Sequence, residues 1–232
     1  MQAATAPVIL LLNSDAFVTP ETLRAGLALM RDQPAAGVAG VQILNPDGSI
    51  QAESGRFPSL WGDICTSLGM DQFGQGARRA PESAAPVDWV HGACMFVRRR
   101  ALESVGGLDP RFFMYSEEVD WCRLFWGVGW EVWYLPEVHV VHIGGASSRS
   151  NDLSRRVALY RSRLGLRRRL DGPHASALLW LAMLAGLAVR IVSRPVLEFL
   201  LRRKLGRQSP RSDLQLLRAI ARMDPLSRFV GT

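Results

Sequence analysis

A run of acidic residues inside an apolar stretch is the first place where this sequence could do chemistry. The stretch FFMYSEEVDWC, residues 112–122, holds Glu117, Glu118 and Asp120 between aromatic and apolar side chains. If residues 117–127 form a helix, Glu117 and Asp120 share one face and Glu118 points about 100° away. A carboxylate that is partly shielded from water has a raised pKa and can act as a general base near neutral pH. The alternative is an acidic first turn that stabilises the helix dipole.

A second candidate lies near the N-terminus, in LLLNSDA, residues 10–16. Asp15 follows an apolar run over residues 7–12 that predicts a strand, so its carboxylate is expected at the carboxyl end of that strand. Open α/β sheets bind ligands at this edge. A Mg²⁺ or Mn²⁺ ion there would take carboxylate oxygens together with substrate phosphates. The alternative is that Asn13 and Asp15 only form a turn.

Two histidines, His139 and His142, occur in the stretch VHVVHIGG. His142 precedes Gly144 and Gly145, and glycine allows the backbone to come close to a ligand. His142 is therefore a candidate to complete a metal site begun by Asp15. Mixed oxygen and nitrogen ligands would favour Mn²⁺ over Mg²⁺. A purely structural histidine is the alternative, and it is the commoner case.

A further candidate site is the stretch VDWVHGA, which contains Asp88, Trp89, His91 and Gly92. A tryptophan exposed in a cleft offers its ring face to a sugar. A tryptophan in the core would serve packing alone, and that is the alternative interpretation of Trp89.

Strand-like and helical segments alternate through the first two thirds of the chain, which predicts an α/β fold. The run over residues 7–12 is expected to be a central parallel strand buried on both faces, because it is continuously apolar. The other expected elements are a helix over 20–32, a strand over 36–44, a turn over 45–49 with a short return strand, a long loop over 53–86 with a short helix near 60–70, a strand over 86–99, helices over 99–105 and 117–127, a strand over 130–136 and an extended piece over 137–145.

The charges divide the chain into two parts. Residues 1–148 contain 10 Arg and 16 Asp+Glu, a net charge of −6, and residues 149–232 contain 17 Arg and one Lys against 5 acidic residues, a net charge of +13. We therefore predict a partial catalytic domain over residues 1–148 and a basic helical tail over residues 149–232. The three cysteines match no zinc or disulfide pattern and are expected to be reduced.

The composition of the tail predicts an association with membranes. Residues 150–170 are arginine-rich and helical in pattern, and residues 175–189 carry no charge, a run shorter than the roughly 20 residues that span a bilayer. An apolar and then amphipathic helix with arginines at its ends is typical of an interfacial anchor, here over residues 175–203, and an anionic membrane surface would attract it. The alternatives are a true span, or packing on the body or on a second subunit of a homo-oligomer. Nucleic acid is not expected as a partner, because no recognition motif is present.

The order and spacing of these motifs resemble family 2 glycosyltransferases, above all the bacterial rhamnosyltransferase-type members that build cell-surface polysaccharide. GACMFVRR, VGGLDPRFF, SEEVDWCRL and HIGGAS follow LLLNSDA in the order of that family, within residues 6–170. The resemblance implies a GT-A (Rossmann-like) fold, an inverting mechanism and a nucleotide-diphosphate donor that carries rhamnose or another hexose. It also implies a glycan or lipid-linked glycan acceptor, and a peripheral place on the cytoplasmic face of the inner membrane.

The same resemblance implies roles for individual residues. Glu118 would be the catalytic base, and Glu117 its neighbouring acid. Asp15, with Asn13 beside it, would meet the donor through a Mn²⁺ or Mg²⁺ ion that His142 also binds. The residues expected at the acceptor are Asp88, Trp89, His91, Gly92, Asp120 and Arg123.

The sequence departs from the family pattern in two respects. The family usually has Asp where this chain has Glu118, so either the longer side chain sits further back or Glu117 is the base. Family members also begin with a strand and a helix that bind the nucleotide before the metal motif. We therefore expect an N-terminally truncated domain that lacks its first strands, and the alternatives are a mis-called start or half of a split enzyme. The alternative function is a non-catalytic paralogue that acts as a membrane-associated partner or scaffold.

Overall fold

The computed structural model describes residues 5–52, 54–70, 80–112, 115–144, 152–201 and 210–226. Its chain contacts divide it into two compact units. The sheet unit comprises residues 1–57, 77–109 and 117–147, and the helical unit comprises residues 58–76, 110–116 and 148–232. Each unit is described by itself.

The sheet unit is built on one mixed sheet of seven strands. Along it the order is β1-β6-β3-β7-β2, with β4 paired to β3 and β5 paired to β7. Only β3 and β7 run parallel, and every other pair is antiparallel. The expected α/β class is therefore confirmed. The strands are β1 Val8–Leu12, β2 Ala16–Phe17, β3 Ala36–Leu44, β4 Ile50–Ala52, β5 Ala85–Pro86, β6 Cys94–Arg98 and β7 Glu131–His142.

The prediction for the first strand was wrong. Strand β1 ends the sheet order and pairs antiparallel with β6, from Val8 opposite Arg98 to Leu12 opposite Cys94. Only Ile9 within it is buried, and Leu12 is 39% exposed. An apolar run reports how hydrophobic a strand is, but not which neighbours it has. The central, buried position belongs to β3, whose segment AGVAGVQIL is filled with small and branched residues.

Two further strand boundaries differ from the expectation. The stretch predicted as one strand over 86–99 supplies only the ends, β5 and β6, with a non-strand segment between them. The stretch predicted as two pieces over 130–145 is the single strand β7, which carries an irregularity at Pro136. Opposite β3, Val41 pairs with Leu135 and the next residue, Gln42, pairs with His139. Proline has no backbone N–H to donate, so it is tolerated where a bulge interrupts the ladder.

This bulge reverses the faces of β7. Before it, Val132 and Tyr134 pack in the core with helix α5 (Glu117–Gly127), and after it Val138 and Val140 pack in the core with helix α1 (Pro20–Asp32). Side chains alternate along a strand, so an odd number of inserted residues moves the same parity to the other face. The orientation of every residue after Pro136, including His142, depends on this insertion.

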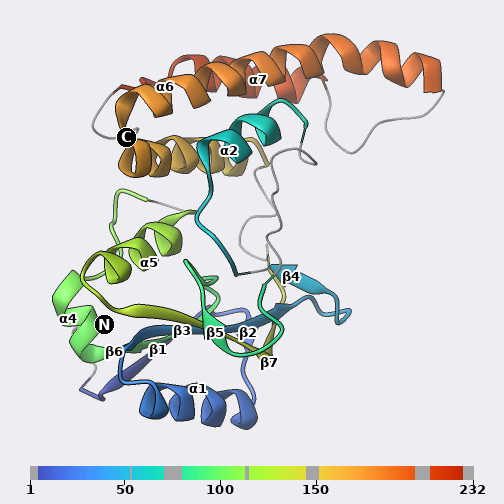
Figure 1. The fold of residues 1–232 in the computed structure, drawn as a ribbon. Helices are drawn as coiled ribbons and strands as arrows, with labels where there is room; N and C mark the ends of the chain where they lie inside the picture. The colour runs from blue at the N-terminus through green and yellow to red at the C-terminus, as the bar shows by residue number, and fades with distance from the viewer. Residues whose placement is uncertain are drawn as a thin grey trace. The chain divides into compact units, whose positions relative to one another are not determined.

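Helices cover both faces of the sheet (Figure 1). Helix α1 (Pro20–Asp32) lies on one face and helices α4 (Arg99–Val105) and α5 (Glu117–Gly127) lie on the other. Strand β6 contributes alternately to the two cores, with Cys94 and Phe96 towards α1 and Met95 and Val97 towards α4 and α5. The period-2 pattern of the strand therefore matches a sheet that is buried on both sides.

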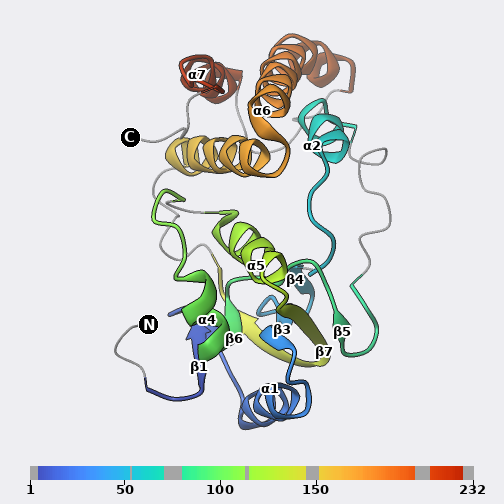
Figure 2. The same cartoon turned by 60° about the vertical axis from the view of Figure 1, so that its left-hand side comes forward.

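The helical unit contains α2 (Leu60–Ser67), α6 (Asp152–Leu201) and α7 (Pro210–Ala221), and α7 runs beside α6 in both views (Figures 1 and 2). The long C-terminal helix that was expected is present, although Gly172 breaks it with a φ of 87°. The predicted membrane segment over 175–203 lies on the part of α6 after this break, and its last residues, 202 and 203, lie outside the described residues. The core of the unit is formed by Leu164, Leu179, Met183, Leu187, Leu216, Ile220 and Met223.

Internal ion pairs use part of the basic charge of the tail. Asp213 on α7 is fully buried, with its carboxylate 2.5 Å from Arg156 and 3.9 Å from Arg194. Asp63 on α2 pairs with Arg163 at 3.0 Å and with Arg167 at 2.7 Å. These arginines hold the helices together, because a buried charge needs a partner. They add less to the outward positive charge than the sequence suggested.

One helix in the described residues is long and apolar enough to cross a membrane, by length and composition alone. It is the stretch Leu153–Arg194 of α6, and 28% of its most apolar window is buried. The same test is also passed by core helices of other proteins, so the finding leaves both an anchor and a packing role open.

Two glycines of α6 form a matched pair for testing this packing. A Cβ at Gly186 would lie 1.8 Å from the main-chain oxygen of Ser67, whereas a Cβ at Gly165 would lie 3.6 Å from the Phe112 ring, an ordinary contact. We expect Gly186→Ala to lower the free energy of unfolding by about 1–3 kcal/mol through overpacking. Gly165→Ala should raise it by up to about 1 kcal/mol through helix propensity. Urea denaturation followed by circular dichroism measures both, and equal effects would contradict the close approach of α2 to α6.

Candidate functional site

Strand pairing brings Asp15 and His142 together. The backbone N–H of Asn13 donates to the Ala93 carbonyl at 3.0 Å, and the Ile143 N–H donates to the Asp15 carbonyl at 3.0 Å. Strand β2 then places Ala16 opposite His142. The result is that Nε2 of His142 lies 3.2 Å from Oδ1 of Asp15 and 3.3 Å from Nδ2 of Asn13.

The donor set of this pair fits a divalent cation. A carboxylate and an imidazole nitrogen, with the Asn13 amide alongside, are hard and borderline ligands of the kind that Mn²⁺ accepts. Within the described ranges no group of three or more His, Cys, Asp or Glu side chains could hold a metal ion. The protein would therefore supply Asp15 and His142, and substrate phosphates and water would fill the remaining positions, as is usual for such ions.

The two glutamates of the acidic stretch begin helix α5. Tyr115 and Ser116 immediately before it have φ values of 69° and 67°, which non-glycine residues rarely adopt. Oε2 of Glu117 and Oε2 of Glu118 are both inaccessible to water, and neither atom has a hydrogen-bond partner. Backbone strain of this kind is stored mostly at functional sites.

Burial raises the pKa of both glutamates. The pKa of Glu118 rises from 4.5 to about 7, mainly because its charged form loses hydration and secondly because the charge of Glu117 lies nearby. The pKa of Glu117 is also raised, for the same main reason. A carboxyl group with a pKa near 7 is suited to take up a proton at neutral pH.

His91 and Gly92 connect the two groups of residues. The ring of His91 lies with its centroid 6.1 Å from that of His142, while a Cβ at Gly92 would lie 3.6 Å from the Cβ of Glu118. The Ala93 N–H donates to Nδ1 of His91 at 3.1 Å. Burial, together with the charge of His142, lowers the pKa of His91 to about 4, so its ring is neutral at physiological pH.

The other predicted acceptor residues are held by local contacts. Asp88 accepts a hydrogen bond from the Phe57 N–H at 2.7 Å, and the indole N–H of Trp89 donates to the Arg56 carbonyl at 3.0 Å. Both contacts go to the residues that precede helix α2 in the chain. Asp120 is buried and its Oδ1 accepts from Nη2 of Arg123 at 3.1 Å. These contacts leave the acceptor role of all four predicted residues an untested prediction.

Comparison with known proteins places this arrangement in a family. Residues 8–200 match the sequence model of the family described as glycosyl transferase family group 2. The chain belongs to this glycosyltransferase family. The matched range contains both the Asp15–His142 pair and the two glutamates, so the family's sequence pattern and the geometry described above refer to the same part of the molecule.

Relatives of this family member include bacterial and archaeal sugar transferases. An N-acetylglucosaminyl-diphospho-decaprenol L-rhamnosyltransferase of Mycobacterium tuberculosis is 33% identical over 161 residues, which cover 66% of this chain and 52% of the relative. The rhamnosyltransferase WbbL of Escherichia coli is 36% identical over 64 residues, 28% of this chain and 24% of WbbL. The chain thus spans about half the length of the mycobacterial relative.

A solved structure also resembles this family member. It is the mannosyltransferase PcManGT from Pyrobaculum calidifontis in complex with GDP-Man and Mn²⁺, with a TM-score of 0.48 and 14% identity over 95% of this chain and 61% of that one.

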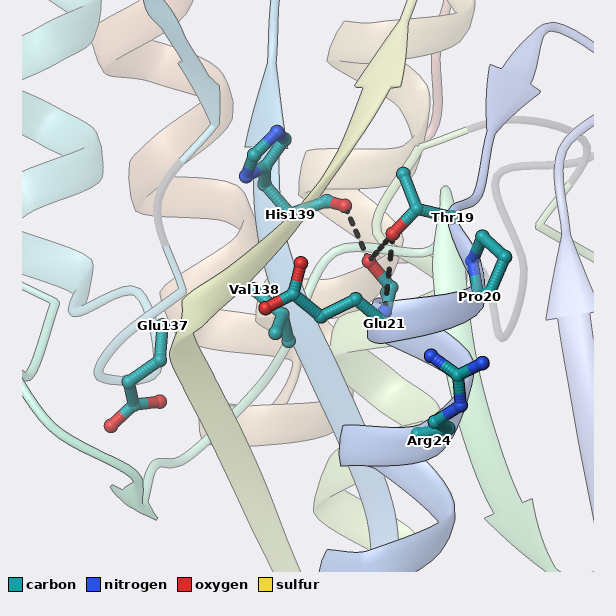
Figure 3. Close-up of a pocket in the computed structure, with 8 residues that line it drawn as sticks. Thr19, Pro20, Glu21, Arg24, Glu137, Val138 and His139 are labelled. Atoms are coloured by element: carbon teal, nitrogen blue, oxygen red, sulfur yellow. Dashed lines mark hydrogen bonds between the residues drawn. The ribbon is translucent and has the colours of Figure 1, made fainter.

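A separate pocket of about 420 Å³ lies at the start of α1 in this family member (Figure 3). Thr19 caps the helix by accepting from the Thr22 N–H at 3.2 Å, and the Thr22 hydroxyl donates to the His139 carbonyl at 2.8 Å. Glu21, Arg24 and Glu137 also line the pocket. His139, the other histidine that the sequence singled out, therefore lies in this pocket, and His142 does not line it.

Sequence reasoning missed one residue of the candidate site. Oε1 of Gln51 lies 2.5 Å from Nδ1 of His142, and Nε2 of Gln51 donates to the His142 carbonyl at 2.8 Å. Glutamine in a short return strand after a turn carries no chemical signal of its own. The sequence places Gln51 in the short strand after the NPDGS turn, and nothing else in the sequence pointed to it.

The raised pKa of Glu118 predicts a pH-dependent penalty on stability. Below pH 4.5 the side chain is neutral in both the folded and unfolded states; between 4.5 and about 7 the unfolded chain loses its proton first, so stability falls as pH rises. We expect Glu118→Gln to match the parent at pH 4.5 and to exceed its free energy of unfolding at pH 8 by on the order of 3 kcal/mol. Urea denaturation at both pH values measures this. The exposed Glu103→Gln serves as control and should show no such pH-dependent gain, and a parent and Glu118→Gln of equal stability at pH 8 would refute the desolvation.

Proposed function

We propose that this chain transfers a sugar, with inversion, from a nucleotide-diphosphate donor to a hydroxyl of a glycan or lipid-linked glycan acceptor. The observation that carries the proposal is a half-buried glutamate of raised pKa, Glu118, whose Oε2 is shielded from water and which is connected through His91 and Gly92 to the Asp15–His142 pair. In the reaction the bond from the anomeric carbon to the diphosphate oxygen breaks, and a bond to the acceptor oxygen forms. The acceptor proton passes to Glu118, and the diphosphate leaves with the electron pair.

Glu118 is the better candidate for the base than Glu117. Its pKa of about 7 lets the carboxylate and the protonated form interconvert at neutral pH, which is what a general base requires. Gly92 lies beside Glu118, where a Cβ would come within 3.6 Å of the Cβ of Glu118. The charge of Glu117 contributes to the raised pKa, which gives that residue a tuning role.

Asp15 and His142 would hold a Mn²⁺ or Mg²⁺ ion on the donor diphosphate, with Asn13 beside them. When bound, the ion would stabilise the negative charge that develops on the leaving group. The mixed oxygen and nitrogen ligands favour Mn²⁺. The residues of this chain keep the two ligands in place through the β2–β7 pairing, so that little reorganisation is needed.

The acceptor is proposed to be lipid-linked and the sugar to be rhamnose or another hexose. The support comes from the mycobacterial relative, whose name states a diphospho-decaprenol acceptor and a rhamnosyl group. Asp88, Trp89, His91, Gly92, Asp120 and Arg123 would shape the acceptor side. The contacts from Asp88 and Trp89 to residues 56 and 57 would fix that wall.

We place the protein peripherally on the cytoplasmic face of the inner membrane. Four apolar side chains of α6, Leu178, Leu181, Val189 and Val192, are between 50% and 73% exposed. At 100° per residue they fall within an arc of about 80°, which forms one apolar stripe. The opposite face, with Leu179, Met183 and Leu187, packs in the core of the helical unit. A helix with one face packed on protein and one apolar face open suits the surface of a membrane better than a span.

Replacement of the proposed base tests the reaction. We expect Glu118→Gln to lower kcat by about 10²–10⁴-fold, the usual contribution of a general base, while Glu117→Gln keeps more of the activity because it retains the proposed proton acceptor. Transfer from nucleotide-diphosphate sugars to a polyprenyl-diphosphate glycan, in the presence of Mn²⁺, is the assay. Turnover of Glu118→Gln above about a tenth of the parent rate would exclude this assignment.

Donor binding provides the control and separates enzyme from scaffold. Calorimetric titration of the parent chain and of Glu118→Gln with nucleotide-diphosphate sugars, in the presence of Mn²⁺, should give nearly equal affinities. Micromolar binding would exclude the non-catalytic partner, whereas no binding and no turnover by the parent chain would favour it.

Liposome flotation tests the membrane surface. We expect the chain to float with vesicles that contain anionic lipid more than with neutral vesicles, because each basic residue near such a surface contributes about 1 kcal/mol. Leu181→Glu combined with Val189→Glu should reduce flotation by tenfold or more. Leu27→Glu, at a 51% exposed apolar residue of α1, is the control and should float like the parent. No preference for anionic lipid, or no loss in the double variant, would overturn the assignment.

A further inference from the structure

Gln51 makes three hydrogen bonds beside the candidate metal pair. Its Oε1 lies 2.5 Å from Nδ1 of His142, and its Nε2 donates to the His142 carbonyl at 2.8 Å and to Oδ1 of Asn45 at 2.9 Å. The Gln51 amide therefore hydrogen-bonds both the ring and the backbone of His142. Gln51 lies on β4, which pairs with β3 and not with β7. The hydrogen bonds of Gln51 to His142 therefore connect β4 with β7, two strands that do not pair with each other.

The chemistry of these contacts determines where the proton of His142 lies. A main-chain carbonyl oxygen can only accept, so the Gln51 atom that faces it must be the NH₂ group. The other amide atom, which faces Nδ1, is then the carbonyl oxygen, and Nδ1 must carry a hydrogen to donate to it. In neutral imidazole this leaves Nε2 with a lone pair, which can accept from Nδ2 of Asn13 at 3.3 Å and lies 3.2 Å from Oδ1 of Asp15. A lone pair beside a carboxylate oxygen is an arrangement that a bound cation stabilises.

We propose that Gln51 is a positioning residue that holds His142 as the Nδ1–H tautomer, with Nε2 free to bind a cation together with Asp15. The proposal rests on the metal role proposed above for His142. Metal-binding histidines commonly donate their other ring N–H to an acceptor, which fixes the tautomer and the ring orientation. Here the acceptor is a neutral amide from a separate strand, which orients the ring without placing another charge beside Asp15.

The surroundings of Gln51 are arranged to keep its amide in place. Asn45, which accepts from Gln51, also donates from Nδ2 to the Ser49 hydroxyl at 2.9 Å, and Ser49 donates from its backbone to Asp47 at 3.0 Å. The turn over 45–49 thus holds the Asn45 side chain. Gly144 has a φ of 63°, and a Cβ there would lie 2.9 Å from Nε2 of Gln51. Position 144 therefore favours glycine for two reasons. The backbone there has a positive φ, and a side chain would crowd the Gln51 amide.

The tautomer can be observed without metal or substrate. Proton–nitrogen correlation spectra of the histidine rings, recorded on the full 232-residue chain at pH 8 without Mn²⁺, should show His142 as the Nδ1–H form. Gln51→Leu removes the acceptor and should give a mixture of tautomers. Gln51→Glu keeps an oxygen opposite Nδ1 and should retain the parent tautomer. Gln33→Leu, the same change at a helix C-cap away from the site, is the matched control and should leave the spectrum of His142 unchanged.

The affinity for Mn²⁺, measured without substrate, distinguishes a residue that orients His142 from one that only holds strand β4 in place. We expect Gln51→Leu to weaken Mn²⁺ binding by about 10–100-fold, as removal of such a partner usually does, and Gln51→Glu, which keeps an acceptor opposite Nδ1, to lose clearly less. If Gln51 only braced β4, both variants would lose its two Nε2 donor bonds. Gln51→Glu would then be at least as damaging as Gln51→Leu, because carboxylate and carbonyl oxygens would face each other. Electron paramagnetic resonance of free Mn²⁺ measures the affinity, and circular dichroism checks folding.

The outcomes are distinct for the two proposals. A parent chain in which His142 is not the Nδ1–H form, or a Gln51→Leu variant that keeps it, overturns the positioning role. A parent chain that binds no Mn²⁺ overturns the proposed metal site, while the tautomer result still decides what Gln51 does.

Discussion

The parallel pairing of β3 with β7 is the interaction on which the sheet unit depends. It joins two strands that each contribute to both cores, and it carries α1 on one side and α4 and α5 on the other. A strand buried on two faces needs both layers in place before it is stable. The same pairing delivers His142, at the end of β7, to Asp15 beyond β1 and to Gln51 on β4. The geometry of the candidate site therefore depends on this pairing.

Desolvation gives the candidate base its chemistry. Glu118 is an ordinary carboxyl group whose pKa moves to about 7 because helix α5 begins inside the protein and because Glu117 lies beside it. That arrangement costs stability at neutral pH, as the linkage between protonation and folding requires. Natural proteins accept such costs mainly where a function depends on them. Asp15, the carboxylate proposed for the cation, remains 22% exposed.

The basic tail shows how the same residue type takes different roles. Arg156, Arg163, Arg167 and Arg194 neutralise buried carboxylates between helices. All four count in the net charge of residues 149–232, but their ion pairs leave less positive charge for a membrane surface. The apolar residues of α6 are divided in the same way, with one face packed against α7 and the other open to solvent. The proposed contact with a membrane surface thus depends on fewer residues of the tail than the composition implied. It depends mainly on the exposed apolar stripe of α6.

The sequence by itself determined the α/β class, the helices over 20–32, 99–105 and 117–127, the long C-terminal helix and the family, because these follow from local periodicity, caps and motif order. It also named Asp15, His142 and Glu118 as residues to examine, and their roles stay predictions. Only the tertiary structure decided that β1 lies at the end of the sheet order, that the bulge at Pro136 turns the faces of β7, and that Gln51 grips His142. These depend on strand neighbours and register, and on a hydrogen bond between residues 91 positions apart. The local sequence pattern does not indicate which distant segment pairs with a strand or accepts a hydrogen bond from a side chain.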